Sequence, residues 1–172
     1  MLTQLARVEA LRDDFEACAR LLDEARVLAG TSPVANVRIK LEHGRMLRSS
    51  GDPQAAFPFF RSAFERAVDA RDHFLAGDAA HMCAIAGTDR DRMEEWTRRG
   101  LELCERETDA AYWAGPLLNN LGWAYYEAGE YERALETFQR APEARERDPD
   151  NDVAVGWAKE AVETALKALG RA

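Results

Sequence analysis

The sequence predicts an all-α protein built from pairs of helices. Apolar residues recur at steps of three and four along almost the whole chain, which indicates amphipathic helices. No segment shows the alternation of apolar and polar residues that is typical of strands. Turn-forming residues interrupt the pattern at short intervals, at residues 30–33, 50–53, 87–89, 129–130 and 148–151. We therefore expect a series of helices of roughly 12 to 18 residues joined by turns.

Several of these turns also supply residues that start the next helix. Ser32 precedes Pro33 and Asp52 precedes Pro53, while Thr88 or Asp89 stands before the helix expected after the third break. A Ser or Asp side chain accepts hydrogen bonds from the first free backbone N–H groups of a helix, and proline is well tolerated directly after such a cap. These capping residues therefore predict where the following helices begin.

A fixed spacing of small and large residues recurs along the chain. A small residue is followed after twelve residues by a second, after four more by a large apolar one, and after three more by another small one. Four sets follow this spacing, the third with the least typical residues: Ala6, Cys18, Leu22 and Ala25; Gly44, Ala56, Phe60 and Ala63; His81, Met93, Thr97 and Gly100; Gly122, Ala134, Phe138 and Ala141.

The recurring set, called the packing ladder below, predicts a repeat. Small residues let two antiparallel helices approach closely, and the large residue fills the remaining space. Successive copies are offset by 38, 37 and 41 residues. One helix pair cannot bury its own apolar face, so such units stack on their neighbours.

The clearest copy, LLNNLGWAYYEAGEYERALETFQRA at residues 117–141, resembles the tetratricopeptide repeat. Its Leu-Gly, tyrosine, glycine–aromatic and Ala-x-x-x-Phe elements follow the pattern of that family in order. The resemblance implies a right-handed superhelical solenoid of antiparallel helix pairs, with about nine helices in a single domain over residues 1–172. The repeats are expected at about 2–30, 33–70, 72–106 and 110–148. Pro58 and Pro142 fall inside expected second helices, where proline kinks or shortens a helix.

The C-terminal segment is expected to form a capping helix at about residues 152–170. Val155, Ala158, Val162, Leu166 and Leu169 share one apolar face, and no partner helix follows them. A terminal helix that covers the last repeat has this pattern.

Composition excludes several classes of function. The 172 residues carry a net charge of −8, which repels nucleic acid. We find neither a membrane-spanning stretch nor a secretory signal. Cys18, Cys83 and Cys104 have wide spacings that suggest neither a disulfide framework nor a zinc site. We expect three buried thiols in a reducing bacterial cytoplasm. The excess of arginine over lysine fits a GC-rich genome.

No catalytic motif is present. His43, His73 and His81 are the only histidines, and the Glu42–His43 pair lacks the second histidine of a zinc-binding helix motif. Glycine-rich phosphate loops and nucleophile elbows are also missing. We therefore predict no enzyme activity, no cofactor and no metal. An enzyme or metal protein that uses His43 or His81 is the least favoured hypothesis.

The first helices of stacked pairs line a concave groove, which such folds use for binding. On the first helix of the fourth predicted pair, Asn119, Trp123 and Tyr126 share a face distinct from that of the packing residues. Subtracting the repeat offsets gives the equivalent positions on the first helices of the earlier pairs. These positions suggest a groove with an arginine-bearing end and an aromatic end. The candidate partner-binding residues are Arg7, Arg45, Arg48, Asp78, Met82, Asn119, Asn120, Trp123 and Tyr126.

Packing explains some of these residues equally well. The capping helix can cover Trp123 and Tyr126, with Trp157 nearby, and Arg45 can pair with Glu42 three residues before it. The leading hypothesis is a non-catalytic protein- or peptide-binding scaffold that uses its concave groove. The alternative is a peptide-sensing or regulatory fragment of a larger regulator. The partner is a protein or peptide, neither nucleic acid nor membrane, and self-association is a further option.

Overall fold

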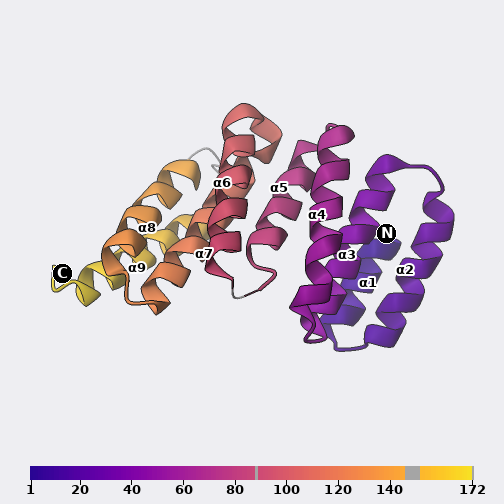
Figure 1. The fold of residues 1–172 in the computed structure, drawn as a ribbon, viewed down its shortest axis with the longest axis horizontal. Coiled ribbons are helices and arrows are strands. Elements are labelled where there is room, and N and C mark those ends of the chain that lie inside the picture. The colour runs from indigo at the N-terminus through magenta and orange to yellow at the C-terminus, as the bar shows by residue number, and fades with distance from the viewer. Residues whose placement is uncertain (88, 146–151, 172) are drawn as a thin grey trace. The chain divides into compact units, whose positions relative to one another are not determined.

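The computed structural model describes residues 1–87, 89–145 and 152–171, with side chains described outside 142–155. Over these residues the chain forms nine α-helices and one 3-10 helix, and no strand occurs among them. The predicted all-α architecture of antiparallel helix pairs is confirmed (Figure 1). The chain divides into two compact units, Met1–Thr88 and Asp89–Ala172, and the boundary falls within the predicted third repeat. The single domain over residues 1–172 stays a prediction.

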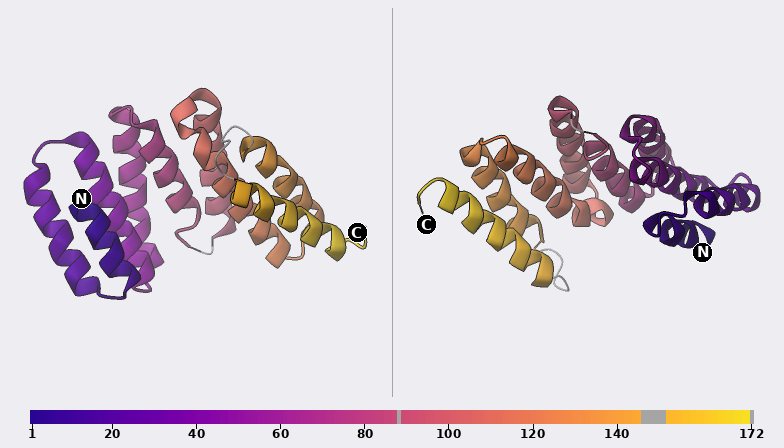
Figure 2. Two further views of the ribbon diagram at one scale, coloured as in Figure 1. Left: turned by 180° about the vertical axis from the view of Figure 1, so that it is seen from behind. Right: turned by 90° about the horizontal axis from the view of Figure 1, so that it is seen from below.

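The first unit contains five helices: α1 (Leu2–Leu11), α2 (Phe15–Ala29), α3 (Pro33–Ser49), α4 (Pro53–Asp69) and α5 (His73–Ala84). Each helix packs against the next one in the chain, and α1 and α5 also contact α3. The antiparallel course of α1 with α2 and of α3 with α4 can be followed in Figure 2. The first helices of the predicted repeats therefore lie side by side within this unit.

The second unit contains α6 (Arg90–Arg106), a 3-10 helix η1 (Thr108–Trp113), α7 (Ala114–Glu127), α8 (Tyr131–Arg145) and α9 (Asp152–Ala168). No feature of the sequence predicted η1. Helix α9 packs against α8, as the predicted capping helix should. Ala158 is buried, and Val162, Leu166 and Leu169 pack against the cores of the same unit. The side chain of Val155 and residues 148–151 lie outside the described part.

Four of the turns share one geometry. A residue with positive φ stands two residues before the first residue of the next helix: Asp13 (φ 62°), Gly51 (φ 94°), Arg71 (φ 55°) and Gly129 (φ 77°). In each turn the residue that follows donates its backbone N–H to a carbonyl five residues earlier, as Asp52 does to Leu47. This pattern satisfies carbonyl groups at the end of the preceding helix.

Side chains cap the helix starts as the sequence predicts. Ser32 and Asp52 accept hydrogen bonds from backbone N–H groups of α3 and α4. Of the two candidates at the third break, Asp89 caps α6 by accepting from the Arg92 N–H at 3.0 Å. Helix α4 runs through Pro58 without ending there.

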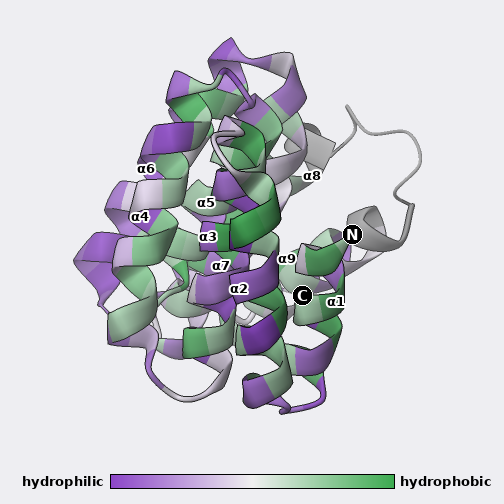
Figure 3. Cartoon of the chain, turned by 90° about the vertical axis from the view of Figure 1, so that its right-hand side faces the viewer, coloured by the Kyte–Doolittle hydropathy of each residue, from purple (hydrophilic) through white to green (hydrophobic). Residues whose placement is uncertain are grey.

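The packing ladder forms the core. Its members in the first, second and fourth copies are all buried, as are Thr97 and Gly100 of the third. A Cβ at Gly44 would stand within 3.0 Å of the Phe60 ring, and one at Gly122 equally close to the Phe138 ring. These two positions therefore require glycine for steric reasons. Figure 3 shows the amphipathic character of the helices, with hydrophobic and hydrophilic residues alternating around them.

Candidate functional site

The predicted arginine-bearing face of the first unit contains a half-buried ion cluster. Arg45 on α3 donates to Glu42 at 2.6 Å and to Asp78 on α5 at 2.5 Å, and the Arg45 side chain is only 14% exposed. Burial lowers the pKa of Arg45, but the two carboxylates outweigh it and raise the pKa overall. Burial also raises the pKa of Glu42, against the opposing charge of Arg45. The cluster joins two first helices through these ion pairs, whereas Glu42 Oε2 and Arg45 Nε are buried without a hydrogen-bond partner among the described residues.

The other predicted residues of this unit differ in exposure. Arg7 is exposed and lies 3.7 Å from Glu42, and Arg48 is exposed and donates from Nε to the Ile85 carbonyl at 3.2 Å. Met82 is buried. Arg7, Arg45 and Asp78 are thus brought together around Glu42, whereas Met82 belongs to the core.

Two histidines lie close to this cluster or to the ladder. His81 on α5 is largely buried, and burial lowers its pKa to about 4, against the charge of Asp78. His43 stacks on the Phe59 ring at a centroid distance of 4.4 Å, and burial also lowers its pKa. Both imidazoles are therefore neutral near pH 7.

The predicted residues of the second unit lie on α7. Asn119, Asn120, Trp123 and Tyr126 are all half-buried. Trp123 contacts Tyr126 edge-on at 5.4 Å and Phe138 at 5.1 Å. Both rings pack against the core formed by α7, α8 and α9 and retain part of their surface in solvent. Trp157 of the capping helix is 63% exposed.

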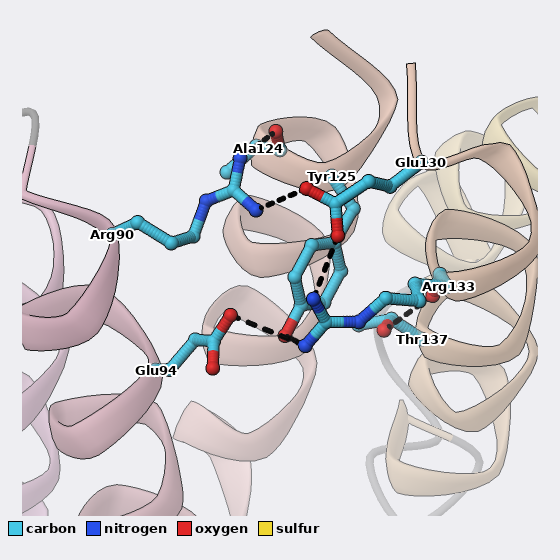
Figure 4. Close-up of polar contacts among 7 residues, drawn as sticks. All are labelled: Arg90, Glu94, Ala124, Tyr125, Glu130, Arg133 and Thr137. Atoms are coloured by element: carbon cyan, nitrogen blue, oxygen red, sulfur yellow. Dashed lines mark hydrogen bonds and ion pairs between the residues drawn. The ribbon is translucent and has the colours of Figure 1, made fainter. Parts of the chain in front are cut away.

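A network of charges surrounds Tyr125 on the other side of α7 (Figure 4). The guanidinium of Arg133 on α8 lies 4.0 Å from the Tyr125 ring and donates to its hydroxyl at 2.7 Å. Arg133 also pairs with Glu130 at 2.6 Å and with Glu94 on α6 at 3.2 Å. Arg90 lies 5.1 Å from the same ring and pairs with Glu130 at 2.8 Å. One tyrosine thus lies between two guanidinium groups, a favourable cation–π arrangement.

The environment of Tyr125 keeps its hydroxyl protonated. Burial raises the pKa of Tyr125 to about 12, with the neighbouring Glu94 acting in the same direction and Arg133 and Arg90 against it. The phenol can therefore donate and accept at any physiological pH. The network connects α6, α7 and α8 into one frame.

A pocket of about 580 Å³ adjoins this frame, along one face of α6. Leu101 of α6 and Leu121 and Tyr125 of α7 supply its apolar wall. Its carboxylates belong to α6: Asp91, Glu94, Glu95, Glu102 and Glu105. Arg98 and Arg140 are the basic lining residues, so acidic groups prevail. The sequence did not predict this pocket.

Thr97 lies at the wall of this pocket with an unusual environment. It is 1% exposed, and its Oγ1 has no hydrogen-bond partner among the described residues. In the packing ladder, Thr97 occupies the position of Leu22, Phe60 and Phe138. A small polar residue at a position for a large apolar one was the sequence signal for this site.

Among the described residues, no three His, Cys, Asp or Glu side chains gather in a metal-binding arrangement. The three cysteines are free and buried, as predicted. Burial raises the pKa of the Cys104 thiol to about 11, and Cys104 Sγ lies 3.0 Å from the Ala110 carbonyl oxygen. Such a thiol is a poor nucleophile, because the reactive thiolate is hardly populated.

Comparison with known proteins supports the repeat. Residues 115–141 match the family model described as tetratricopeptide repeat. The fold is similar to a crystal structure of nearly identical TPR-like repeats from a Podosopora anserina protein described as a putative kinesin light chain, and to a single-substitution variant of that protein. Each comparison has a TM-score of 0.65 at 15% identity and covers 99% of this chain. The match covers 86% of the first chain and 85% of the variant. None of the curated proteins matches in sequence.

The helix pairs, the ladder and these matches define an all-α protein of the helical-repeat class. Within that class, residues 115–141 match a tetratricopeptide repeat, and the fold is similar to that of TPR-like repeats. Repeats of this family generally mediate contacts between proteins, and the fold is typically a non-catalytic scaffold. No helix of the described residues is long and apolar enough to cross a bilayer.

Proposed function

We propose that this chain is a non-catalytic protein- or peptide-binding module that uses the exposed face of its first helices. The observation that carries the proposal is the surface of α7 inside the matched repeat. There the edge-on pair of Trp123 and Tyr126 is half-buried beside Asn119 and Asn120. Aromatic side chains that are held by packing and remain partly in solvent are typical binding anchors, and amides can pair with a peptide backbone.

The arginines contribute unequally to this proposal. Arg7 and Arg48 are exposed and can meet acidic groups of a partner. Arg45 and Asp78 are bonded to each other, so in this proposal they hold α3 to α5 and do not contact the partner directly. The proposal includes a cytoplasmic location in a bacterium, which the three buried free thiols support.

Selection from a displayed library of random peptides tests this function. Peptides enriched on the native chain should lose binding to N119A and Y126A. They should keep binding to Y112A, a matched control that removes an exposed tyrosine from η1. Circular dichroism shows whether each variant is folded. A library without enriched peptides, or equal binding to Y126A and Y112A, would overturn the proposal.

A further inference from the structure

We propose that the pocket along α6 is a second binding site, and that it receives a basic, lysine- or arginine-bearing segment of a partner protein. The inference rests on the proposed function in one respect, namely that the chain binds proteins. It concerns different residues, because the pocket lies beside the Tyr125 network whereas the proposed peptide face carries Asn119 and Tyr126.

Charge complementarity favours a cationic occupant. Five carboxylates line the pocket against two guanidinium groups. Arg98 is already paired with Glu95 at 2.7 Å and with Glu102 at 2.5 Å. Asp91 and Glu105 form no ion pair among the described residues, and both are exposed to solvent. A basic segment would also be attracted by the net charge of −8.

The Thr97 hydroxyl is an observation independent of charge. A buried hydroxyl without a partner destabilises a protein, because it has given up its hydrogen bonds to water. Thr97 lines the pocket, so an occupant that donates to Oγ1 would remove this penalty. A hydroxyl oxygen has two lone pairs and accepts readily from an ammonium, a guanidinium or a backbone N–H.

The apolar wall favours a peptide side chain over a bare ion. Leu101 and Leu121 can cover the aliphatic stem of a lysine or arginine while its charged end reaches the carboxylates. The described residues contain no metal-binding arrangement of carboxylates. The neighbouring Arg133 illustrates the chemistry within the same unit, since its guanidinium lies over Tyr125 and pairs with Glu94 and Glu130.

Fluorescence anisotropy with a labelled peptide of alternating lysine and alanine tests the proposal. The native chain should bind this probe and should not bind the corresponding peptide of glutamate and alanine. Binding should weaken strongly near 1 M salt, where the Debye length falls to about 3 Å. Equal binding of the two peptides, or no binding of the basic one, would overturn the proposal.

Two variants place the binding in the pocket. D91N/E105Q removes two carboxylates of the pocket, and the dissociation constant should rise about tenfold, since each exposed ion pair contributes up to about a factor of five. E127Q/E136Q changes the net charge equally on exposed carboxylates outside the pocket and should leave the constant within about twofold of the native value. Equal weakening by both pairs would indicate attraction by overall charge alone and contradict a site.

T97V tests the hydroxyl. Valine has the same shape, so the melting temperature should stay the same or rise, whereas affinity for the basic peptide should fall several-fold. Unchanged affinity would restrict the contact to the acidic rim and overturn the pocket as the site. Free spermidine that binds as tightly as the peptide, with the same loss in D91N/E105Q, would show a polyamine site and contradict a protein partner.

The failure of this inference can be told apart from that of the proposed function. Library peptides that bind through Asn119 and Tyr126, together with no binding of the basic probe, would remove the pocket site and leave the proposed function intact. Binding of the basic probe that depends on Asp91 and Glu105, with no effect of Y126A on any peptide, would retain the pocket and remove the α7 face.

Discussion

The two units use charged residues in opposite ways. In the first unit, Arg45 is surrounded by Glu42 and Asp78 and nearly excluded from solvent. In the second unit, carboxylates outnumber guanidinium groups in the lining of the open pocket along α6. The first arrangement pairs its opposite charges with each other and joins helices. The second has charges left over, and these are what a partner can bind.

The largest expected effect is on the buried cluster of the first unit. R45M leaves Glu42 and Asp78 without their cation in a poorly hydrated place, which should lower the free energy of unfolding by about 3–5 kcal/mol. R98M is the matched control in the second unit, because Arg98 makes two ion pairs but is exposed. Denaturant titration should show no clear change for R98M. Similar midpoints for R45M and the native chain would remove the contrast between the units.

Acid should weaken the first unit through His81. Its pKa of about 4 lies below the ordinary 6.5, so the unfolded chain takes up the proton first as the pH falls. The stability that depends on neutral His81 is complete above about pH 6.5 and is lost toward pH 4, by up to about 3 kcal/mol. The raised pKa of Glu42 acts in the opposite direction, because the folded state protonates this carboxyl first.

Comparison with H81Q isolates the histidine. The free energy of unfolding of the native chain, measured by denaturant titration from pH 7 to pH 4, should fall relative to that of H81Q. Parallel curves for the two proteins would mean that His81 titrates normally.

The close contact of glycine with phenylalanine should be equal in the two units. G44A and G122A each place a methyl group against a phenylalanine ring, so each should destabilise by about 1–3 kcal/mol. G156A is the control, since its added methyl group meets no described atom within 4 Å beyond its own stretch of helix, and alanine favours a helix by about 0.5–1 kcal/mol. Thermal unfolding distinguishes the three. Unchanged stability of G122A would refute the helix register.

A smaller effect is expected at Tyr125. Y125F keeps the ring between Arg90 and Arg133 but removes the hydroxyl that accepts from Arg133, which should lower the free energy of unfolding by about 0.5–1.5 kcal/mol. A loss of several kcal/mol would indicate that the hydroxyl, and not the ring, organises the network.

The sequence predicted the features that depend on local spacing. The packing ladder, the capping residues Ser32 and Asp52 and the terminal helix follow from steps of three, four and twelve residues, which a helix converts directly into contacts. Glycine marked two of the turns. Asp13 and Arg71 adopt the same left-handed conformation without being glycine, so composition gave no sign of those turns.

The candidate sites were predicted less completely, for a physical reason. Arg90 and Glu130 are 40 residues apart, and long flexible side chains choose partners only when the helices are in place. Predicting the pocket likewise required the positions of the folded helices, although the sequence did show Thr97 at a position of the packing ladder. Arg45 is the opposite case, a predicted binding residue that the structure uses internally. Its residue type suggested binding, but it is paired with Glu42 and Asp78 and largely buried.

Nuclear magnetic resonance of the ¹⁵N-labelled chain during titration with the basic peptide tests the contrast between the units most directly. Amide signals of Thr97 and Leu101 should shift progressively, while those of Arg45 and Asp78 should remain unchanged. Shifts at Arg45 and Asp78 with none at Thr97 would show that the first unit, and not the second, holds the available charges.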